Sequence, residues 1–139
     1  MIDRSHGYRP ALGTFVAPGA FDHLTYLATP YSHPDAPVRE LRYRAACAIA
    51  AVMTARGDLV YSPVAHGHGI ALSGSLPVTW EHWKRLDLRM LRACDSLTVA
   101  CVAGWKDSHG VQAEIAAARE LGLPVWFVDP CGNPMEEPK

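Results

Sequence analysis

Residues 95–129 read DSLTVACVAGWKDSHGVQAEIAAARELGLPVWFVD. Apolar and β-favouring residues dominate residues 96–102 and 125–128, which predicts two buried strands. Between them, apolar residues and one acid recur at helical spacing, namely Val111, Glu114, Ile115, Ala118 and Leu121. A strand, a helix and a second strand in succession form the repeating unit of a parallel sheet. This segment therefore predicts an α/β fold.

The preceding residues continue this alternation. Short apolar runs predict strands at residues 24–28 and 59–62. Helical spacing predicts one helix from about Val78 to Ala93 and another from about Pro37 to Arg56, with an apolar face made of Val38, Leu41, Ala45, Ile49 and Val52. Residues 63–77 are rich in glycine and are expected to form a loop. We therefore expect a doubly wound parallel sheet of four to five strands, flavodoxin-like or Rossmann-like, with helices on both faces.

The length of the chain suits one domain. It has 139 residues, of which 49% are hydrophobic, enough for a single compact core. We place the domain at residues 24–130. Residues 1–23 are rich in glycine, proline and polar residues without a clear period, so we expect an N-terminal arm or tail. Residues 131–139 are expected to form a C-terminal tail.

The balance of charge favours a small-molecule partner. Lysine and arginine total 13 against 14 acidic residues, so no strong field attracts nucleic acid or an anionic membrane surface. No apolar run approaches the roughly 20 residues of a spanning helix, and the N-terminus lacks the apolar core of a signal peptide. We therefore expect a cytoplasmic protein that binds neither nucleic acid nor membranes.

Two acidic residues interrupt the apolar faces of their predicted helices. Glu114 lies on the apolar side of its helix, and Asp87 falls within a stripe made of Trp80, Trp83, Met90, Leu91 and Cys94. Burying an ionised carboxylate costs several kcal/mol unless it is paired, so such acids belong to satisfied networks or to reactive sites. For one acid both explanations are equally open. Two such acids on helices that flank one strand favour chemistry.

The loops that follow the strands are expected to meet at one site, because open parallel sheets bind ligands at the carboxyl ends of their strands. These loops are residues 29–33, the segment around His66 and His68, and residues 104–110. They supply the candidate substrate-binding residues Ser32, His66, His68, Trp105, Ser108 and Gly110.

Residues 108–110 have the pattern of an anion site. Ser108 is a good N-cap, and Gly110 lets a ligand approach the free amides of the first helical turn. Ser108 fits a purely capping role equally well. Trp105 is the tryptophan we expect to stack on a ligand ring, whereas Trp80 and Trp83 fit the core or a subunit contact better.

His66 and His68 leave two interpretations open: they recognise the substrate, or they only order their loop. They have the chemistry of metal ligands, but no further cysteine or histidine motif stands nearby, so we expect no metal site. We expect no organic cofactor either.

Three spaced motifs resemble the nucleoside 2-deoxyribosyltransferase-like superfamily. They are Asp87-Leu88-x-x-Leu91-x-x-x-Asp95, Ser108-x-Gly110-x-x-x-Glu114-x-x-x-Ala118 and Gly122-x-Pro124-Val125. The resemblance covers roughly Tyr26 to Asp129. It implies an enzyme that cleaves or transfers at the N-glycosidic bond of a nucleoside or nucleotide, and that assembles as a homodimer or a higher homo-oligomer.

The resemblance also implies roles for single residues. Glu114 matches the glutamate that attacks the anomeric carbon and forms a glycosyl-enzyme ester. Asp87 matches the acid associated with the base and with proton transfer. Tyr31 occupies the place of a tyrosine that lies beside the glutamate, although it also fits a surface loop residue. Asp95 matches an acid that we interpret as structural.

The branch of the superfamily depends on Ser108, which precedes Glu114 by six residues. A serine at this place is typical of hydrolases of nucleoside 5′-monophosphates, because it tolerates a phosphate that a carboxylate repels. Asp107 lies one residue earlier, and an acid is typical of deoxyribosyltransferases, which exchange bases. We expect the hydrolase, with the transferase and a non-catalytic nucleotide-binding or sensing domain as alternatives.

Overall fold

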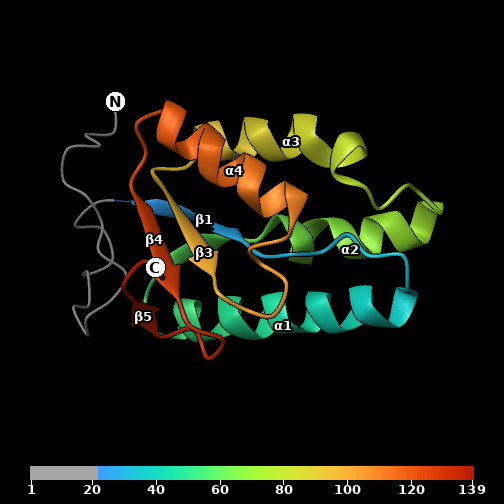
Figure 1. Ribbon diagram of the computed structural model, residues 1–139, viewed down its shortest axis with the longest axis horizontal. Helices are drawn as coiled ribbons and strands as arrows, with labels where there is room; N and C mark the ends of the chain where they lie inside the picture. The colour runs from blue at the N-terminus through green and yellow to red at the C-terminus, as the bar shows by residue number, and fades with distance from the viewer. Residues whose placement is uncertain (1–21) are drawn as a thin grey trace.

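The computed structural model describes residues 22–139, so almost all of the expected N-terminal arm lies outside the described residues. Strands and helices alternate along the chain except at two places, where α3 follows α2 and β5 follows β4 (Figure 1). They are β1 (Leu24–Ala28), α1 (Ala36–Ala55), β2 (Leu59–Tyr61), α2 (Pro63–Gly74), α3 (Trp80–Ala93), β3 (Ser96–Ala100), α4 (His109–Glu120), β4 (Val125–Val128) and β5 (Pro134–Met135).

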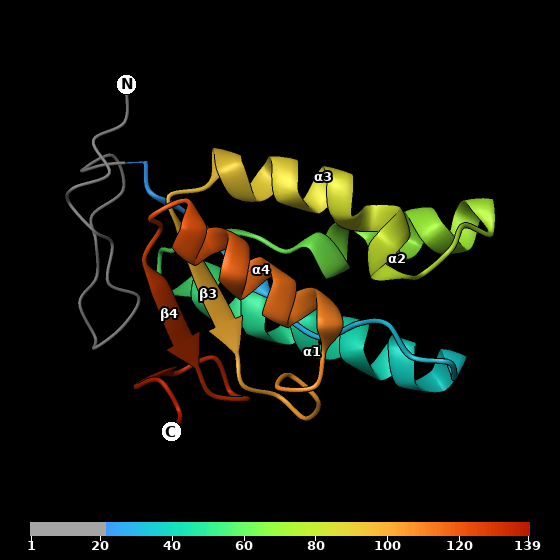
Figure 2. The ribbon, with the colours of Figure 1, turned by 45° about the horizontal axis from the view of Figure 1, so that its top comes forward.

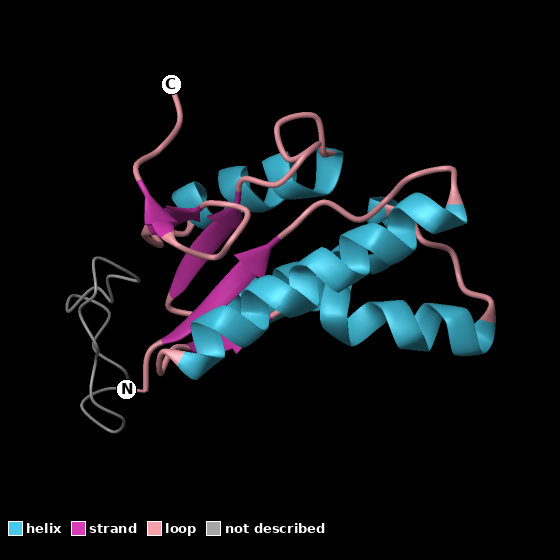
Figure 3. Ribbon diagram, turned by 90° about the horizontal axis from the view of Figure 1, so that it is seen from below, coloured by secondary structure: helices cyan, strands magenta, loops and turns pink. Residues whose placement is uncertain are grey.

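One sheet forms the centre of the fold, with the strand order β2-β1-β3-β4-β5. The first four strands pair in parallel, and β5 pairs antiparallel with β4. Helices α3 and α4 lie over one face (Figure 2), and α1 crosses the other face, which Figure 3 shows from below. The expected doubly wound α/β fold with helices on both faces is confirmed.

Alternation along β1 divides the core between the two faces of the sheet. Tyr26 and Ala28 pack in the cluster formed with α3 and α4, whereas Leu27 packs with Ile49 and Met53 of α1. All three β1 side chains have no exposed surface. Because successive side chains of a strand point to opposite faces, the position of Tyr26 in β1 directs its phenol toward α4.

Helix α1 buries a face that agrees only in part with the one that the sequence pattern suggested, because Ile49 is buried as expected and other predicted members are not. Leu41 and Val52 are exposed, while Ala46, Ile49 and Met53 are buried. Alanine, valine and leucine alternate so densely here that several faces look apolar, and packing against β1 selects one of them. At 20 residues α1 is a long helix, but no helix within residues 22–139 is both long and apolar enough to cross a membrane.

The expected loop at residues 63–77 is wrong, because most of this segment forms α2. The Oγ of Ser62 accepts the backbone N–H of Ala65 at 3.1 Å, and Pro63 occupies the first turn, where its missing N–H costs nothing. Glycine weakens a helix by about 1 kcal/mol relative to alanine. Here the helix forms in spite of Gly67, which packs against the Trp83 ring, and an added Cβ would meet that ring at an ordinary contact distance of 3.6 Å.

Both expected tails contain ordered contacts. His23 is buried, and its Nε2 lies 3.0 Å from Ser96 Oγ. In residues 131–139, β5 adds a fifth strand that the sequence pattern did not reveal. Asp95 is buried at the start of β3, where its Oδ2 accepts the N–H of Leu24 at 2.9 Å, in agreement with a structural role.

The cap of α2 is open to a direct test. Ser62→Ala removes the hydroxyl that accepts the Ala65 N–H, so the free energy of unfolding should fall by about 1 kcal/mol. Urea denaturation followed by circular dichroism measures this change. Ser73→Ala, on the exposed side of the same helix, should stay within about 0.5 kcal/mol of the wild type. Equal effects of the two changes would contradict the capping role of Ser62.

Candidate active site

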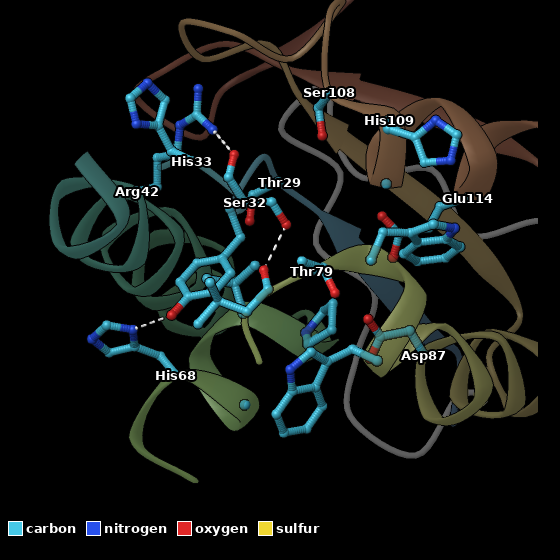
Figure 4. Close-up of a pocket in the computed structure, with 18 of the residues that line it drawn as sticks. Thr29, Ser32, His33, Arg42, His68, Thr79, Asp87, Ser108, His109 and Glu114 are labelled. Carbon is cyan, nitrogen blue, oxygen red and sulfur yellow. Dashed lines mark hydrogen bonds between the residues drawn. The ribbon is translucent and has the colours of Figure 1, made fainter. Parts of the chain in front are cut away.

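A cavity of about 600 Å³ opens at the carboxyl ends of the strands. This volume lies within the range of small-molecule sites. Its walls come from the loop after β1, from α1, α2 and α3, and from the loop that leads into α4 (Figure 4). The predicted convergence of the loops after β1 and β3 is therefore confirmed, with helix α2 in place of the expected histidine loop.

Glu114 lies in the cavity wall from the second turn of α4 and is only 4% exposed. The hydroxyl of Tyr26 donates a hydrogen bond to its Oε2. Burial raises the pKa of Glu114 to about 8, against the hydrogen bond from Tyr26, which lowers it, and with the charge of Asp87, which raises it further. Burial in the ligand-free protein therefore favours the protonated form of this carboxyl.

Asp87 lines the same cavity from α3 and is half-buried. Burial raises its pKa to about 6. Figure 4 shows both acids on one side of the cavity. Two carboxyls with raised pKa values in one cavity are typical of a site of acid and base chemistry, since each is able to hold or release a proton near neutral pH. The sequence prediction placed both acids correctly.

The expected contact between Tyr31 and Glu114 is wrong. The hydroxyl of Tyr31 lies 2.7 Å from His68 Nδ1, and the phenol that contacts Glu114 belongs to Tyr26. In the sequence, Tyr26 is one residue of an apolar strand, and nothing in that pattern marks it as a site residue. Burial, together with the charges of Glu114 and Asp87, raises the pKa of its hydroxyl well above the usual value, so it stays a hydrogen-bond donor.

The two histidines of α2 have different environments. His68 is buried in the cavity wall, between the hydroxyl of Tyr31 and the carboxylate of Glu40, whose Oε2 lies 2.8 Å from its Nε2. His66 is exposed and lies against the Tyr61 ring, outside the cavity wall. The structure therefore supports a place at the site for His68 alone, because helical spacing turns the two side chains in different directions.

The start of α4 forms another part of the wall. Ser108 Oγ accepts the Val111 N–H at 3.2 Å, so it caps the helix while it lines the cavity. Gly110 also lines the cavity. An added Cβ at Gly110 would come within 3.3 Å of the Trp80 ring, so a larger residue would crowd this wall.

Arg42 of α1 is a cation in the cavity wall that the sequence analysis missed. Its Nη1 donates to the Ser32 carbonyl at 2.7 Å, while the Ser32 hydroxyl bonds to the Val78 carbonyl at 2.8 Å. Gly104 has a φ of +90°, and an added Cβ there would lie 2.7 Å from Arg42 Nη2. Because Gly104 has no side chain, the Arg42 guanidinium fits in this position. The sequence does contain a sign of this position, because Arg42 precedes the buried Ala46 by one helical turn and so lies on the same face of α1.

The tryptophans reverse their expected roles. Trp105 packs edge-on against Phe127, with ring centroids 6.1 Å apart, and does not line the cavity. Trp80 and Trp83, which were expected in the core or at a subunit contact, both line the cavity. They lie on the same helix as Asp87, so the cavity offers flat apolar surface to an aromatic ligand near the Asp87 carboxyl.

Within the described part of the chain, Thr29 places a hydroxyl without a hydrogen-bond partner in the cavity wall. It lines the cavity and is 6% exposed, and its Oγ1 has no hydrogen-bond partner within residues 22–139. A buried hydroxyl without a partner costs about 1–3 kcal/mol, which a bound polar group would recover. In the same part of the chain, no three histidine, cysteine, aspartate or glutamate side chains are placed to hold a metal ion together.

Comparison with known protein families gives one match. The family described as a domain of unknown function (DUF1937) matches residues 23–129. The chain belongs to the DUF1937 family. The DUF1937 match contains every residue of the cavity wall, from Thr29 to Glu114. No curated protein gives a significant sequence match.

The raised pKa values predict how stability depends on pH. The folded protein holds protons on Glu114 and Asp87 that the unfolded chain releases, so the free energy of unfolding should fall as pH rises. For Glu114 this loss begins at the ordinary pKa of 4.5 and is complete above about 8. Glu114→Gln should remove about 3–5 kcal/mol of this dependence. Urea denaturation at several pH values measures it.

The matched control is Glu120→Gln, which changes an exposed glutamate of the same helix. It should keep the slope of the wild type. A Glu114→Gln protein whose stability falls as steeply with pH as that of the wild type would contradict a proton-retaining Glu114.

Proposed function

We propose that the protein hydrolyses the N-glycosidic bond of a nucleoside 5′-monophosphate, with Glu114 as the nucleophile. The observation that carries this proposal is the buried Glu114 carboxyl, held by Tyr26 in the same cavity as Asp87. Cleavage of this bond develops positive charge on the sugar and negative charge on the leaving base. A carboxylate and a proton donor in one cavity answer both needs.

The two acids have separate parts in the proposed reaction. Glu114 attacks the anomeric carbon, the bond from that carbon to the base nitrogen breaks, and Asp87 gives its proton to the base. A glycosyl ester on Glu114 remains. Asp87, now ionised, takes a proton from water, which attacks the anomeric carbon and releases the sugar phosphate and the Glu114 carboxylate. These steps need no metal or organic cofactor.

The proton balance of the two acids fits this sequence of steps. Between pH values of about 6 and 8 the pair holds one proton, since the pKa of Asp87 is about 6 and that of Glu114 about 8. The reactive form has that proton on Asp87 and the charge on Glu114. Tyr26 favours this form, because its hydroxyl donates to the charged carboxylate of Glu114.

The polar end of the cavity suits a phosphate. Arg42 supplies guanidinium donors, and α4 directs the amides of its first turn toward the same cavity near Ser108 and Gly110. Trp80 and Trp83 supply apolar surface for the base. The preference for a monophosphate over a free nucleoside rests on Arg42 and on the start of α4.

The proposal places the protein in the nucleoside 2-deoxyribosyltransferase-like superfamily. Asp107 also lines the cavity, and it favours the alternative of a deoxyribosyltransferase, in which a second base replaces water. A cytoplasmic location and a homodimer or higher homo-oligomer remain predictions. A non-catalytic nucleotide-binding domain is the remaining alternative.

The first test is the release of free base. The wild type, incubated with ribonucleosides, deoxyribonucleosides and their 5′-monophosphates, should release base from a monophosphate, measured by chromatography. Glu114→Ala should lower this rate by at least about a thousandfold, because no ester forms without the carboxylate. Exchange with an added free base would indicate the transferase. A folded protein that releases base from no substrate would sink the enzyme proposal.

The variant Arg42→Gln tests the expected preference for a monophosphate over a free nucleoside. This change should lower kcat/KM for the monophosphate by about 10- to 100-fold, since it removes charge-assisted hydrogen bonds. Turnover of the corresponding free nucleoside should change little. An equal loss with both substrates would count against a phosphate site at Arg42.

The pH profile of base release should be bell-shaped. With Asp87 and Glu114 both protonated at low pH, no nucleophile exists, and with both ionised at high pH, no acid protonates the base. kcat/KM should therefore rise through an apparent pKa of about 6 and fall through one of about 8, both belonging to the pair. Asp87→Asn should abolish the fall at high pH. A wild-type profile that is flat from pH 5 to 9 would be incompatible with this pair.

A further inference from the structure

One wall of the cavity contains a row of hydrogen bonds that the proposed chemistry does not use. We call it the His68 network, made of Tyr31, His68 and Glu40. His68 Nδ1 lies 2.7 Å from the Tyr31 hydroxyl, and its Nε2 lies 2.8 Å from Glu40 Oε2. Tyr31 and His68 both line the cavity. Figure 4 shows His68 on the side of the cavity away from Glu114 and Asp87.

Ring contacts and hydrogen bonds hold the imidazole of His68 in place. The His68 residue is 6% exposed, and its ring stacks on Tyr43 with centroids 4.1 Å apart and an interplanar angle of 21°. The Tyr31 ring meets it edge-on at 5.6 Å. Both ring nitrogens have a polar partner, so rotation of the ring would break two hydrogen bonds inside a packed wall. The orientation of His68 is therefore fixed.

Glu40 sets the direction of the hydrogen bonds. Hydrogen bonds from His68 and Arg44 lower the pKa of Glu40, so its carboxylate is ionised at neutral pH and only accepts. The hydrogen of a neutral imidazole must then lie on Nε2, which leaves Nδ1 as an acceptor. In that neutral form of His68, the hydroxyl of Tyr31 donates to Nδ1. Its only hydrogen is thus occupied, so its oxygen acts as an acceptor, as it already does for the guanidinium of Arg39.

We propose that Tyr31, oriented by His68 and Glu40, is a specificity-determining hydrogen-bond acceptor that selects ligands with an N–H or O–H donor at this wall. The chain of bonds from Tyr31 to Glu40 runs in one direction, and each bond strengthens the next, so the phenol oxygen is a better acceptor than an isolated one. His68 and Glu40 are positioning residues. The identification of the ligand as a nucleotide rests on the proposed function, and the donor is then an amino group of the base or a sugar hydroxyl.

The test compares nucleotides that differ by one donor. Binding is measured by calorimetry in the Glu114→Gln protein, where no base release consumes the ligand. The pairs are adenosine and purine riboside 5′-monophosphates, guanosine and inosine 5′-monophosphates, and each ribonucleotide with its 2′-deoxy form. One donor should improve affinity, and the further change Tyr31→Phe should reduce that preference by about 3- to 10-fold while the partner ligand binds as before.

Two further variants separate orientation from structure. Tyr43→Phe removes the hydroxyl of the ring that stacks on the same imidazole, and Tyr43 is not part of the cavity wall, so the preference should persist. Glu40→Gln replaces a pure acceptor with a carboxamide, which lets His68 take either tautomer and frees the Tyr31 hydrogen. This change should weaken the preference by a similar factor. A merely structural role would weaken both ligands of a pair equally.

The outcomes separate this inference from the proposed function. Base release by the wild type, without any pair whose preference depends on Tyr31, would overturn the inference and leave the function standing. A preference that Tyr31→Phe removes would support the inference even if no base were released. Failure of the folded protein to bind any of these nucleotides at millimolar concentration would overturn both.

Discussion

The buried contact between Tyr26 and Glu114 is the constraint on which the rest of the structure depends. It joins the middle of β1 to α4 across 88 residues of sequence, and neither side chain is more than 4% exposed. A carboxyl in such surroundings needs a polar partner, and Tyr26 supplies it only if β1 presents that side chain to α4. A slip of one residue in the register would bring Leu27 there instead. The register of β1 and the hydrogen bond that satisfies the buried Glu114 carboxyl therefore depend on each other.

Burial also gives the two acids different properties. Glu114 is enclosed between the sheet and α4, whereas Asp87 stands on the half-buried side of α3, so desolvation raises the pKa of Glu114 further than that of Asp87. The cavity walls are mainly helical, and the helices rest on a packed sheet. Side chains placed in this way lose little freedom when a ligand binds.

The sequence predicted most of the fold, and it predicted those parts of the site that depend on local pattern. Glu114 and Asp87 were identified because an acid within an apolar stripe is visible over a few residues. Tyr26 was missed because its partner is remote in sequence. Helix α2 was missed because its glycines outweighed the start signal of Ser62 and Pro63. The stripe of α3 was recognised, but a pattern of apolar residues does not distinguish a core from the wall of a cavity.

The two residues of β5 have a consequence for the sheet as a whole. A parallel sheet that ended at β4 would present an unpaired row of backbone amides and carbonyls, to which a strand of another molecule can add. β5 covers part of that row, and Pro134 within it has no N–H to offer to a further strand. At the opposite end the edge strand β2 is only three residues long. Both margins of the sheet are thus poor templates for edge-to-edge aggregation.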